Sequence, residues 1–217
     1  MISPPAFRTL SEPFPNLPPQ GEAHVWMAPQ LHFSEGRLSP QQGRAAITDA
    51  RKYLHTLLSK YLGGDPASLN IYRDGAGKPS IDGMEFSVSH SGSIALFAFA
   101  SVAVGIDVES SLRSVQALAI AERYFQASEV ECLRGLNDVE RQSLFIRMWV
   151  AKEAAVKLSG AGIARGLSDV ECDFTMSAPR VFHRGRLVHL YEFSVGEHHR
   201  AALASWEPLC VNFFSLP

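Results

Sequence analysis

Hydrophobic residues recur every three or four positions in two long stretches of the chain, and this spacing predicts two long helices. The first helix is expected to begin at Ser39 and Pro40, which suit a helix N-terminus, and to end at Gly63. The second is expected to begin after Asn137, a typical N-cap, and to end at Gly160. Its apolar residues lie on two opposite faces, so we expect both faces of this helix to be buried.

Shorter apolar runs predict strands, with two short helices between them. Three closely spaced runs predict an antiparallel meander at 85–90, 93–100 and 102–109. The other expected strands are at 23–28, 169–174, 187–195 and 199–206. Short helices are expected at 114–125 and after a cap at Ser128. A helix followed by strands therefore occurs twice, which indicates an internal duplication.

The composition is that of an ordinary globular protein of 217 residues, 46% hydrophobic and 19% charged. A net charge of −2 gives no general attraction to nucleic acid or anionic membranes, and no apolar run is long enough to span a membrane. Three widely spaced cysteines favour a reducing compartment over a disulfide framework. Prolines crowd residues 1–22, which predicts an extended segment; the chain start does not resemble a signal peptide, so we expect a cytoplasmic protein.

Two carboxylates end the strand expected at 102–109. Asp107 and Glu109 share one face of this strand, because alternate residues of a strand point the same way. Two neighbouring carboxylates repel one another, and one takes up a proton unless a cation lies between them. The segment alone is also compatible with a strand end that enters solvent, where acidic residues cost little.

The long C-terminal helix adds a second charged pair. Trp149, Glu153 and Lys157 follow one another at steps of four residues, so they lie on one side of the helix. Apolar residues flank them there, and a shielded Glu–Lys pair is costly unless it meets a ligand or partner. We therefore interpret this pair as functional.

A third group of polar residues lies before these carboxylates. Ser89 and His90 end a strand at a Ser-Gly turn, where side chains can face a ligand, and Lys78 stands in a Gly-Lys-Pro turn that suits a phosphate. A turn histidine and a solvated lysine are the simpler interpretation of each residue alone. No G-x-S-x-G sequence surrounds these serines, so a hydrolase triad is not predicted.

Together these segments resemble the 4′-phosphopantetheinyl transferase superfamily, in its larger single-chain, pseudo-dimeric, surfactin-synthetase-activating type. The resemblance covers roughly residues 24–205 and rests on four motifs in family order. They are Gly77-Lys78-Pro79, "FSVSHS" at 86–91, "GIDVE" at 105–109 and "WVAKEAAVK" at 149–157. Ser87 stands where asparagine is common in the family, and Ala161 lies where a glycine-lysine-glycine turn is often seen.

The resemblance implies an α+β fold of two similar α/β halves related by a pseudo-twofold, each a helix packed on a small, mainly antiparallel sheet. The halves would be 23–104 and 105–217, with coenzyme A and Mg²⁺ bound in the cleft between them. By position, Asp107, Glu109 and Glu153 would be the metal ligands, which would explain the paired carboxylates. The protein would act as a monomer on an apo acyl or peptidyl carrier protein, with no nucleic acid or membrane partner.

The reaction that the resemblance implies is attack by a carrier serine on the β-phosphate of coenzyme A, which releases 3′,5′-ADP. Glu153 would deprotonate the serine, directly or through water, and Lys157 would neutralise the leaving phosphate. The phosphates of coenzyme A would contact four residues: Arg44, Lys78, Ser89 and His90. Either Tyr124 or Phe125 is expected to stay exposed as an anchor for the carrier, although both equally suit the core face of a short helix.

The same residues are compatible with two other functions. One is a magnesium-dependent phosphohydrolase of nucleotides or coenzyme A, for which the sequence supplies no separate water-activating residue. The other is a non-catalytic module that binds a carrier protein, for which loss of Glu153 or Lys157 would be the sign. Both residues are present.

Overall fold

The computed structural model describes residues 5–9, 13–29, 40–73, 75, 77–92, 94–112, 115–162, 166–176 and 178–216. Its helices are α1 (Pro40–Leu62), α2 (Ala117–Tyr124), α3 (Ala127–Arg134) and α4 (Asp138–Ser159). The strands of the first half are β1 (Arg8–Thr9), β2 (Glu22–Pro29), β3 (Tyr72–Arg73), β4 (Pro79–Ser80), β5 (Glu85–Ser91) and β6 (Ile94–Ala100). Those of the second are β7 (Val104–Ser110), β8 (Val170–Asp173), β9 (Arg180–His183), β10 (Arg186–Val195), β11 (His199–Ser205) and β12 (Cys210–Ser215).

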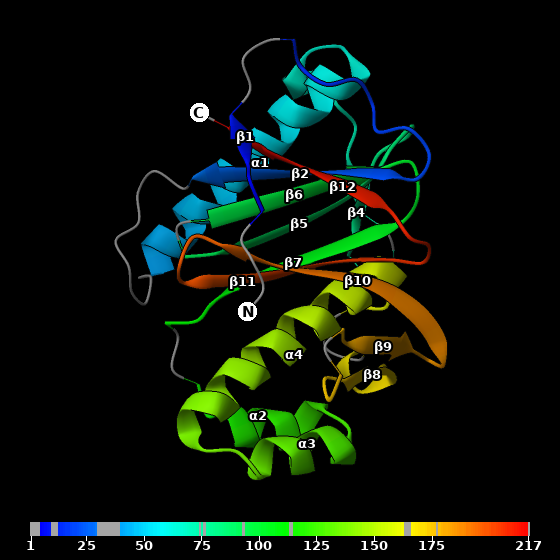
Figure 1. Cartoon of the computed structure of the whole chain (residues 1–217). Coiled ribbons are helices and arrows are strands. Elements are labelled where there is room, and N and C mark those ends of the chain that lie inside the picture. Colours follow the sequence, from blue (N-terminus) through cyan, green and yellow to red (C-terminus); the bar gives the residue numbers. More distant parts are fainter. Residues whose placement is uncertain are drawn as a thin grey trace.

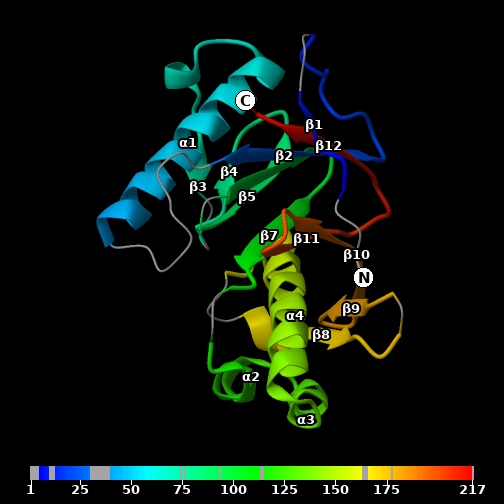
Figure 2. The ribbon, with the colours of Figure 1, turned by 60° about the vertical axis from the view of Figure 1, so that its left-hand side comes forward.

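Ten of the described strands form two five-stranded sheets that are stacked between helices, and β3 and β4 form a separate two-stranded sheet. The first sheet has the order β1-β12-β2-β6-β5, and the second has the order β7-β11-β10-β9-β8. Figure 1 shows α1 above the first sheet and α4, with α2 and α3, below the second. In Figure 2, α4 lies beneath β7 and β11, with α2 and α3 at its N-terminal end. The α+β fold with a helix on each sheet, as predicted, is confirmed.

Side chains alternate across each sheet and so build separate cores. Val25 and Leu96 face the second sheet and join a core that lies between the two sheets. Trp26 and Phe97 point the other way and pack against Leu57 of α1. Both faces of each sheet are covered by other parts of the protein. The edges at which the two sheets meet therefore remain as the place where a site can form.

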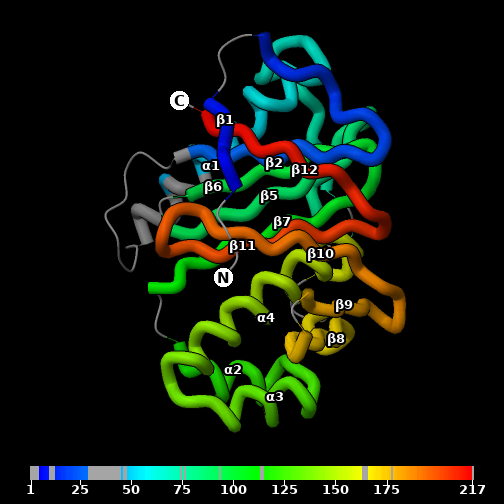
Figure 3. Tube along the Cα trace, viewed as in Figure 1, coloured from blue at the N-terminus to red at the C-terminus, as the bar shows by residue number. Residues whose placement is uncertain are grey.

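One predicted strand has a different partner from the one expected, and the last strand, β12, was not predicted. β5 and β6 form the expected antiparallel hairpin, but β7 pairs with β11 instead of β6, so the three strands are not a meander. β12 crosses back and lies parallel to β2, and β1 pairs with β12 (Figure 3). The final strand of the predicted half 105–217 therefore belongs to the first sheet, and the segment 1–22 contributes a short strand. Alternation within a strand does not specify its partner, which is why the sequence pattern of β7 predicted the wrong neighbour.

The predicted helix ends agree with the structure in three places. α1 ends before Gly63, whose φ of 80° suits glycine. The Asn137 side chain accepts hydrogen bonds from two amides of α4, and Gly160 ends this helix in the left-handed conformation. α3 instead begins at a capping box of Gln126 and Glu129, so the cap predicted at Ser128 is wrong. Ser39 lies outside the described residues. Within the part of the chain that is described, no helix is long and apolar enough to cross a membrane.

Candidate active site

Three serines on one face of β5 join the two sheets. The side-chain oxygens of Ser87, Ser89 and Ser91 accept hydrogen bonds from the backbone N–H groups of Ile106, Val108 and Ser110, at 3.0, 3.3 and 3.2 Å. We call these three serines the serine ladder. β7 is the last strand of its sheet, so no further strand pairs with these N–H groups and the ladder hydroxyls accept from them instead.

The serine ladder also holds both carboxylates of β7. The Ser89 hydroxyl donates to Oδ1 of Asp107 at 2.7 Å, and the Ser91 hydroxyl donates to Oε1 of Glu109 at 3.0 Å. Ile106 and Val108 point into the core between the sheets. Asp107 is only 3% exposed, so this strand end is not simply solvated.

The α4 helix adds Glu153 and Lys157 to the carboxylates of β7. The Lys157 ammonium lies 2.7 Å from Oδ1 of Asp107 and 4.0 Å from Oε2 of Glu153. The Glu153 and Lys157 side chains are only 13% and 20% exposed, so the pair is shielded as the helical pattern predicts. The site therefore combines one ammonium with closely spaced carboxylates from two elements.

Close approach of α4 to β7 depends on Gly105. A Cβ atom at this position would lie 2.0 Å from the carbonyl oxygen of Ala154 and 2.4 Å from the amide nitrogen of Leu158. Because both atoms belong to the helix backbone, no side-chain movement makes room for it. Gly105 therefore sets the distance between Asp107 and the residues of α4.

Burial, together with neighbouring carboxylates, changes the acidity of Glu153. Burial raises its pKa to about 7, and the negative charges of Asp107 and Glu109 act in the same direction. The Lys157 ammonium opposes this shift. A hydrogen bond between the Glu153 and Asp107 carboxyl groups also favours a proton on Glu153. A further positive charge placed between these carboxylates would therefore stabilise their ionised forms.

Within the described residues, no three His, Cys, Asp or Glu side chains are arranged to enclose a metal ion by themselves. Lys157 occupies Oδ1 of Asp107, and Glu109 is bonded to Ser91 and to the amide of Ser110. A full protein cage is not what Mg²⁺ requires, because this ion keeps several waters and uses one or two carboxylates together with substrate phosphates. Oxygen-only ligands and mutual repulsion of the carboxylates fit such a hard cation.

The other predicted site residues differ in where the structure places them. His90 is exposed beside the ladder, and the Lys78 ammonium donates to the carbonyl of Val104 at 3.4 Å. Ser89 is buried and bonded to Asp107, so its hydroxyl supports the carboxylate from inside the protein. Arg44 belongs to α1, and its side chain lies outside the described part. The direct contacts of these four residues with a ligand stay predictions.

The expected docking aromatics are not both available. Phe125 is buried and stacks on Phe145 and Trp149, so it is a core residue and is not the exposed member of the predicted pair. Tyr124 is half-buried and packs against two of the hydrophobic cores. The sequence pattern of a short amphipathic helix allows an aromatic residue at its end to be either a core residue or an exposed docking residue. Only the packing against α4 shows which of the two it is.

Sequence comparisons identify proteins to which this chain is similar. A family model described as the 4′-phosphopantetheinyl transferase superfamily matches residues 103–204, which include Gly105, Asp107, Glu109, Glu153 and Lys157. The 4′-phosphopantetheinyl transferase HetI of Nostoc sp. is 32% identical over 215 aligned residues, covering 86% of this chain and 90% of HetI. The transferase psf-1 of Bacillus pumilus is 33% identical over 142 residues, covering 62% of this chain and 60% of psf-1. The transferase Sfp of Bacillus subtilis is 29% identical over 114 residues, covering 51% and 50%.

Gly105→Ala is expected to displace α4 from β7 and to impair the site. The added methyl meets helix backbone, so we expect a loss of roughly 3 kcal/mol in the free energy of unfolding and a large loss of activity. Gly135→Ala is the matched control, because its Cβ would meet nothing closer than 3.7 Å and its backbone is already right-handed. Urea unfolding of both variants measures the difference. Equal stability of the two variants would contradict the close approach.

Proposed function

Because the chain belongs to the 4′-phosphopantetheinyl transferase superfamily, we propose that the site between β7 and α4 modifies an apo acyl or peptidyl carrier protein. It is a 4′-phosphopantetheinyl transferase, and coenzyme A donates the phosphopantetheine arm. The observation that supports this location is the cluster of Asp107, Glu153 and Lys157, which is shielded from water and supported by the serine ladder.

In the proposed reaction the hydroxyl oxygen of a carrier serine attacks the β-phosphorus of coenzyme A. A new bond forms between that oxygen and phosphorus, and the bond from phosphorus to the bridging oxygen breaks. The products are the phosphopantetheinylated carrier and 3′,5′-ADP. Such a transfer depends mainly on positioning and charge stabilisation, with little covalent chemistry for the protein itself.

Asp107, Glu109 and Glu153 are the residues that would hold Mg²⁺. When bound, this ion stabilises negative charge on phosphate oxygens. The geometry supports the assignment because the three side chains offer only oxygen ligands, and the pKa of Glu153 is raised by burial and by its acidic neighbours. The ladder hydroxyls keep Asp107 and Glu109 in place before any ligand arrives.

The roles of Glu153 and Lys157 follow from their environment. Glu153 lies shielded beside Asp107 and takes the proton of the carrier serine directly or through water; because Glu153 would also hold Mg²⁺ and a metal-bound carboxylate is a weak base, the route through water suits it. Lys157 lies one helical turn further along α4 and presents its ammonium to the negative charge that grows on the leaving phosphate. Lys78, His90 and Arg44 contribute further contacts to the phosphates of coenzyme A, and Ser89 acts through Asp107.

A cavity beside the carboxylates is the proposed docking surface for the carrier protein. It has a volume of about 840 Å³ and lies between the start of α2 and the N-terminal half of α4. Its lining includes Leu118, Val139, Ile146 and Arg200, and Arg200 stands opposite Glu109 in the sheet. Carrier proteins present an acidic helix with a few apolar residues, and this surface offers apolar side chains next to an arginine.

The cytoplasm is the proposed location. Cys132, Cys172 and Cys210 are all free thiols in the structure, which is the usual state in a reducing compartment.

Carrier modification by the unsubstituted protein and by Asp107→Asn and Glu153→Gln tests the function and the site together. With apo carrier, coenzyme A and saturating Mg²⁺, mass spectrometry should show the gain of one phosphopantetheine arm. Both variants should be slower by about a hundredfold or more, since each loses a carboxylate that acts on the reacting groups. Glu140→Gln, an exposed carboxylate on the same helix, is the control and should retain full activity.

The other outcomes separate the alternatives. Release of 3′,5′-ADP without a change in carrier mass would make the protein a phosphohydrolase. Carrier binding with neither product would make it a binding module. Full activity of either carboxylate variant would show that its residue has been assigned wrongly.

Val139→Glu should weaken docking without affecting coenzyme A. Val139 is 81% exposed at the rim of the cavity, and a new carboxylate there would repel an acidic carrier helix. We expect KM for the carrier to rise about tenfold while KM for coenzyme A stays unchanged. Met176→Glu is the control, because Met176 is also an exposed apolar residue, at 64%, but does not line the cavity. The docking surface would lie elsewhere if both variants behaved alike in steady-state kinetics.

A further inference from the structure

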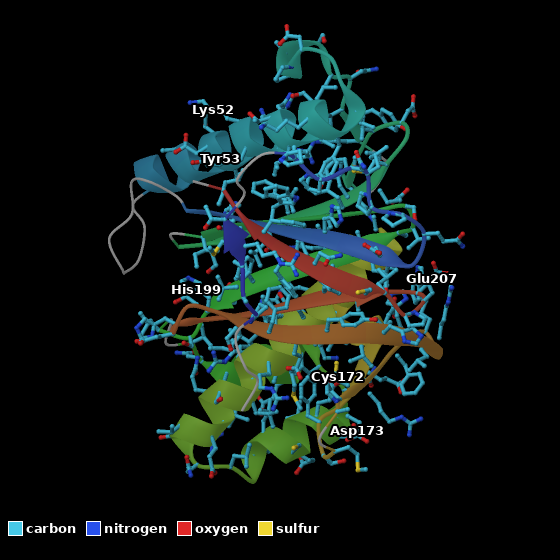
Figure 4. The ribbon with its side chains drawn as sticks, turned by 45° about the horizontal axis from the view of Figure 1, so that its top comes forward. Lys52, Tyr53, Cys172, Asp173, His199 and Glu207 are labelled. Atoms are coloured by element: carbon cyan, nitrogen blue, oxygen red, sulfur yellow. The ribbon has the colours of Figure 1, made fainter. Side chains whose placement is uncertain are left out.

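Lys152, the residue before Glu153, has a fully buried side chain. Its ammonium lies 2.8 Å from Oε2 of Glu129, and the exposed fractions of the two side chains are 0% and 2%. The Glu129 carboxylate also accepts hydrogen bonds from the backbone N–H of Cys172 at 2.7 Å and that of Gln126 at 2.8 Å. Figure 4 shows Cys172 inside the second half and Asp173 further out.

The Lys152 ammonium is held from several directions. It donates to the carbonyl oxygens of Leu167, at 3.4 Å, and Val170, and it lies 4.8 Å from the centre of the Phe125 ring. These contacts tie α4 to α3, to Leu167 and the first residue of β8, and to the residue that follows α2. Because its partners lie on several elements, the ammonium restrains both the orientation of α4 and its distance from these elements.

Stability alone does not explain this ion pair. Desolvation of two buried charges offsets most of their attraction, and apolar residues of similar size often stabilise a protein equally well. Hydrogen bonds between charged groups are directional, however, whereas apolar contacts permit small rotations and slides. The pair is therefore suited to fix the orientation of α4.

The rotation of α4 about its own axis matters for the active site, because Glu153 and Lys157 reach the site from a different face of this helix than Lys152. Successive residues of a helix point about 100° apart, so Lys152 faces α3 and β8 while Glu153 faces β7. At the side-chain radius of about 5 Å, a rotation of about 10° moves a group by roughly 1 Å. Displacements of this size are enough to slow a reaction strongly.

We propose that Lys152 is a positioning residue: its ion pair with Glu129 fixes the rotation of α4, so that Glu153 and Lys157 face Asp107. The proposal rests on the roles given above to Glu153 and Lys157. Lys152 itself touches neither Asp107 nor the reacting groups. It acts through the helix from a position that is fully enclosed by protein.

The test removes both charges and keeps the shapes of the side chains. Lys152→Met retains the aliphatic stem, and Glu129→Gln retains an acceptor for the amide of Cys172. The double variant avoids a buried unpaired charge, so we expect its melting temperature to stay within about 5 °C of the unsubstituted protein. Val181→Ala, a buried position on β9, is the control for a simple loss of stability at roughly 2 kcal/mol.

Steady-state transfer from coenzyme A to an apo acyl carrier protein, measured well below each melting temperature, gives the result. The double variant should have a kcat at least about fivefold lower, with KM for coenzyme A within about twofold. Val181→Ala should keep its kcat. A smaller fall in kcat, or an effect confined to KM, would overturn the proposal.

Two further measurements complete the interpretation. If Glu153→Gln is as active as the unsubstituted protein, the role of Glu153 fails, and this failure is separate from the result for Lys152. If the double variant does not fold, Lys152→Met alone is measured in the same way. Failure of both to fold would make the pair a requirement for folding and would also overturn a positioning role.

Discussion

The hydrogen bonds from the backbone of β7 to the serine ladder of β5 are the interaction on which the site depends. An edge strand leaves N–H groups that need partners, and here hydroxyl oxygens supply them at the meeting of two sheets. A hydroxyl can accept and donate at once. Ser89 and Ser91 therefore hold the strand with one lone pair and orient a carboxylate with the proton.

The second support of the site comes from α4. Gly105 lets the helix backbone lie directly on β7, and Lys157 then reaches Asp107. Neither half of the chain makes the site alone: Ser89 comes from the first sheet, Asp107 from the second and Lys157 from the helix below it. Charges that repel one another are thus gathered in a shielded place, which suits a reaction that moves negative charge between phosphate groups.

Periodicity predicted those parts of the site that lie within one element. Asp107 and Glu109 share a face because a strand repeats every two residues, and Glu153 and Lys157 share one because a helix repeats every 3.6. These patterns do not specify which strands and helices lie next to one another. The runs at β6 and β7 look alike whether they form a meander or enter different sheets, and the return of β12 to the first sheet leaves no local signal. Lys152 was missed for a similar reason, since a lysine is usually exposed and only its partner Glu129 on another helix explains its burial.

Amide hydrogen exchange in Ser87→Ala tests the joining of the sheets most directly. Ser87 accepts from the amide of Ile106. The amide of Asp107 points to the other side of the strand, toward β11, and serves as the internal reference. The account predicts that exchange at Ile106 accelerates at least about tenfold more than exchange at Asp107, because only Ile106 loses its hydrogen-bond partner. Equal acceleration of the two amides, or none, would contradict the claim that the ladder hydroxyls hold β7 in place.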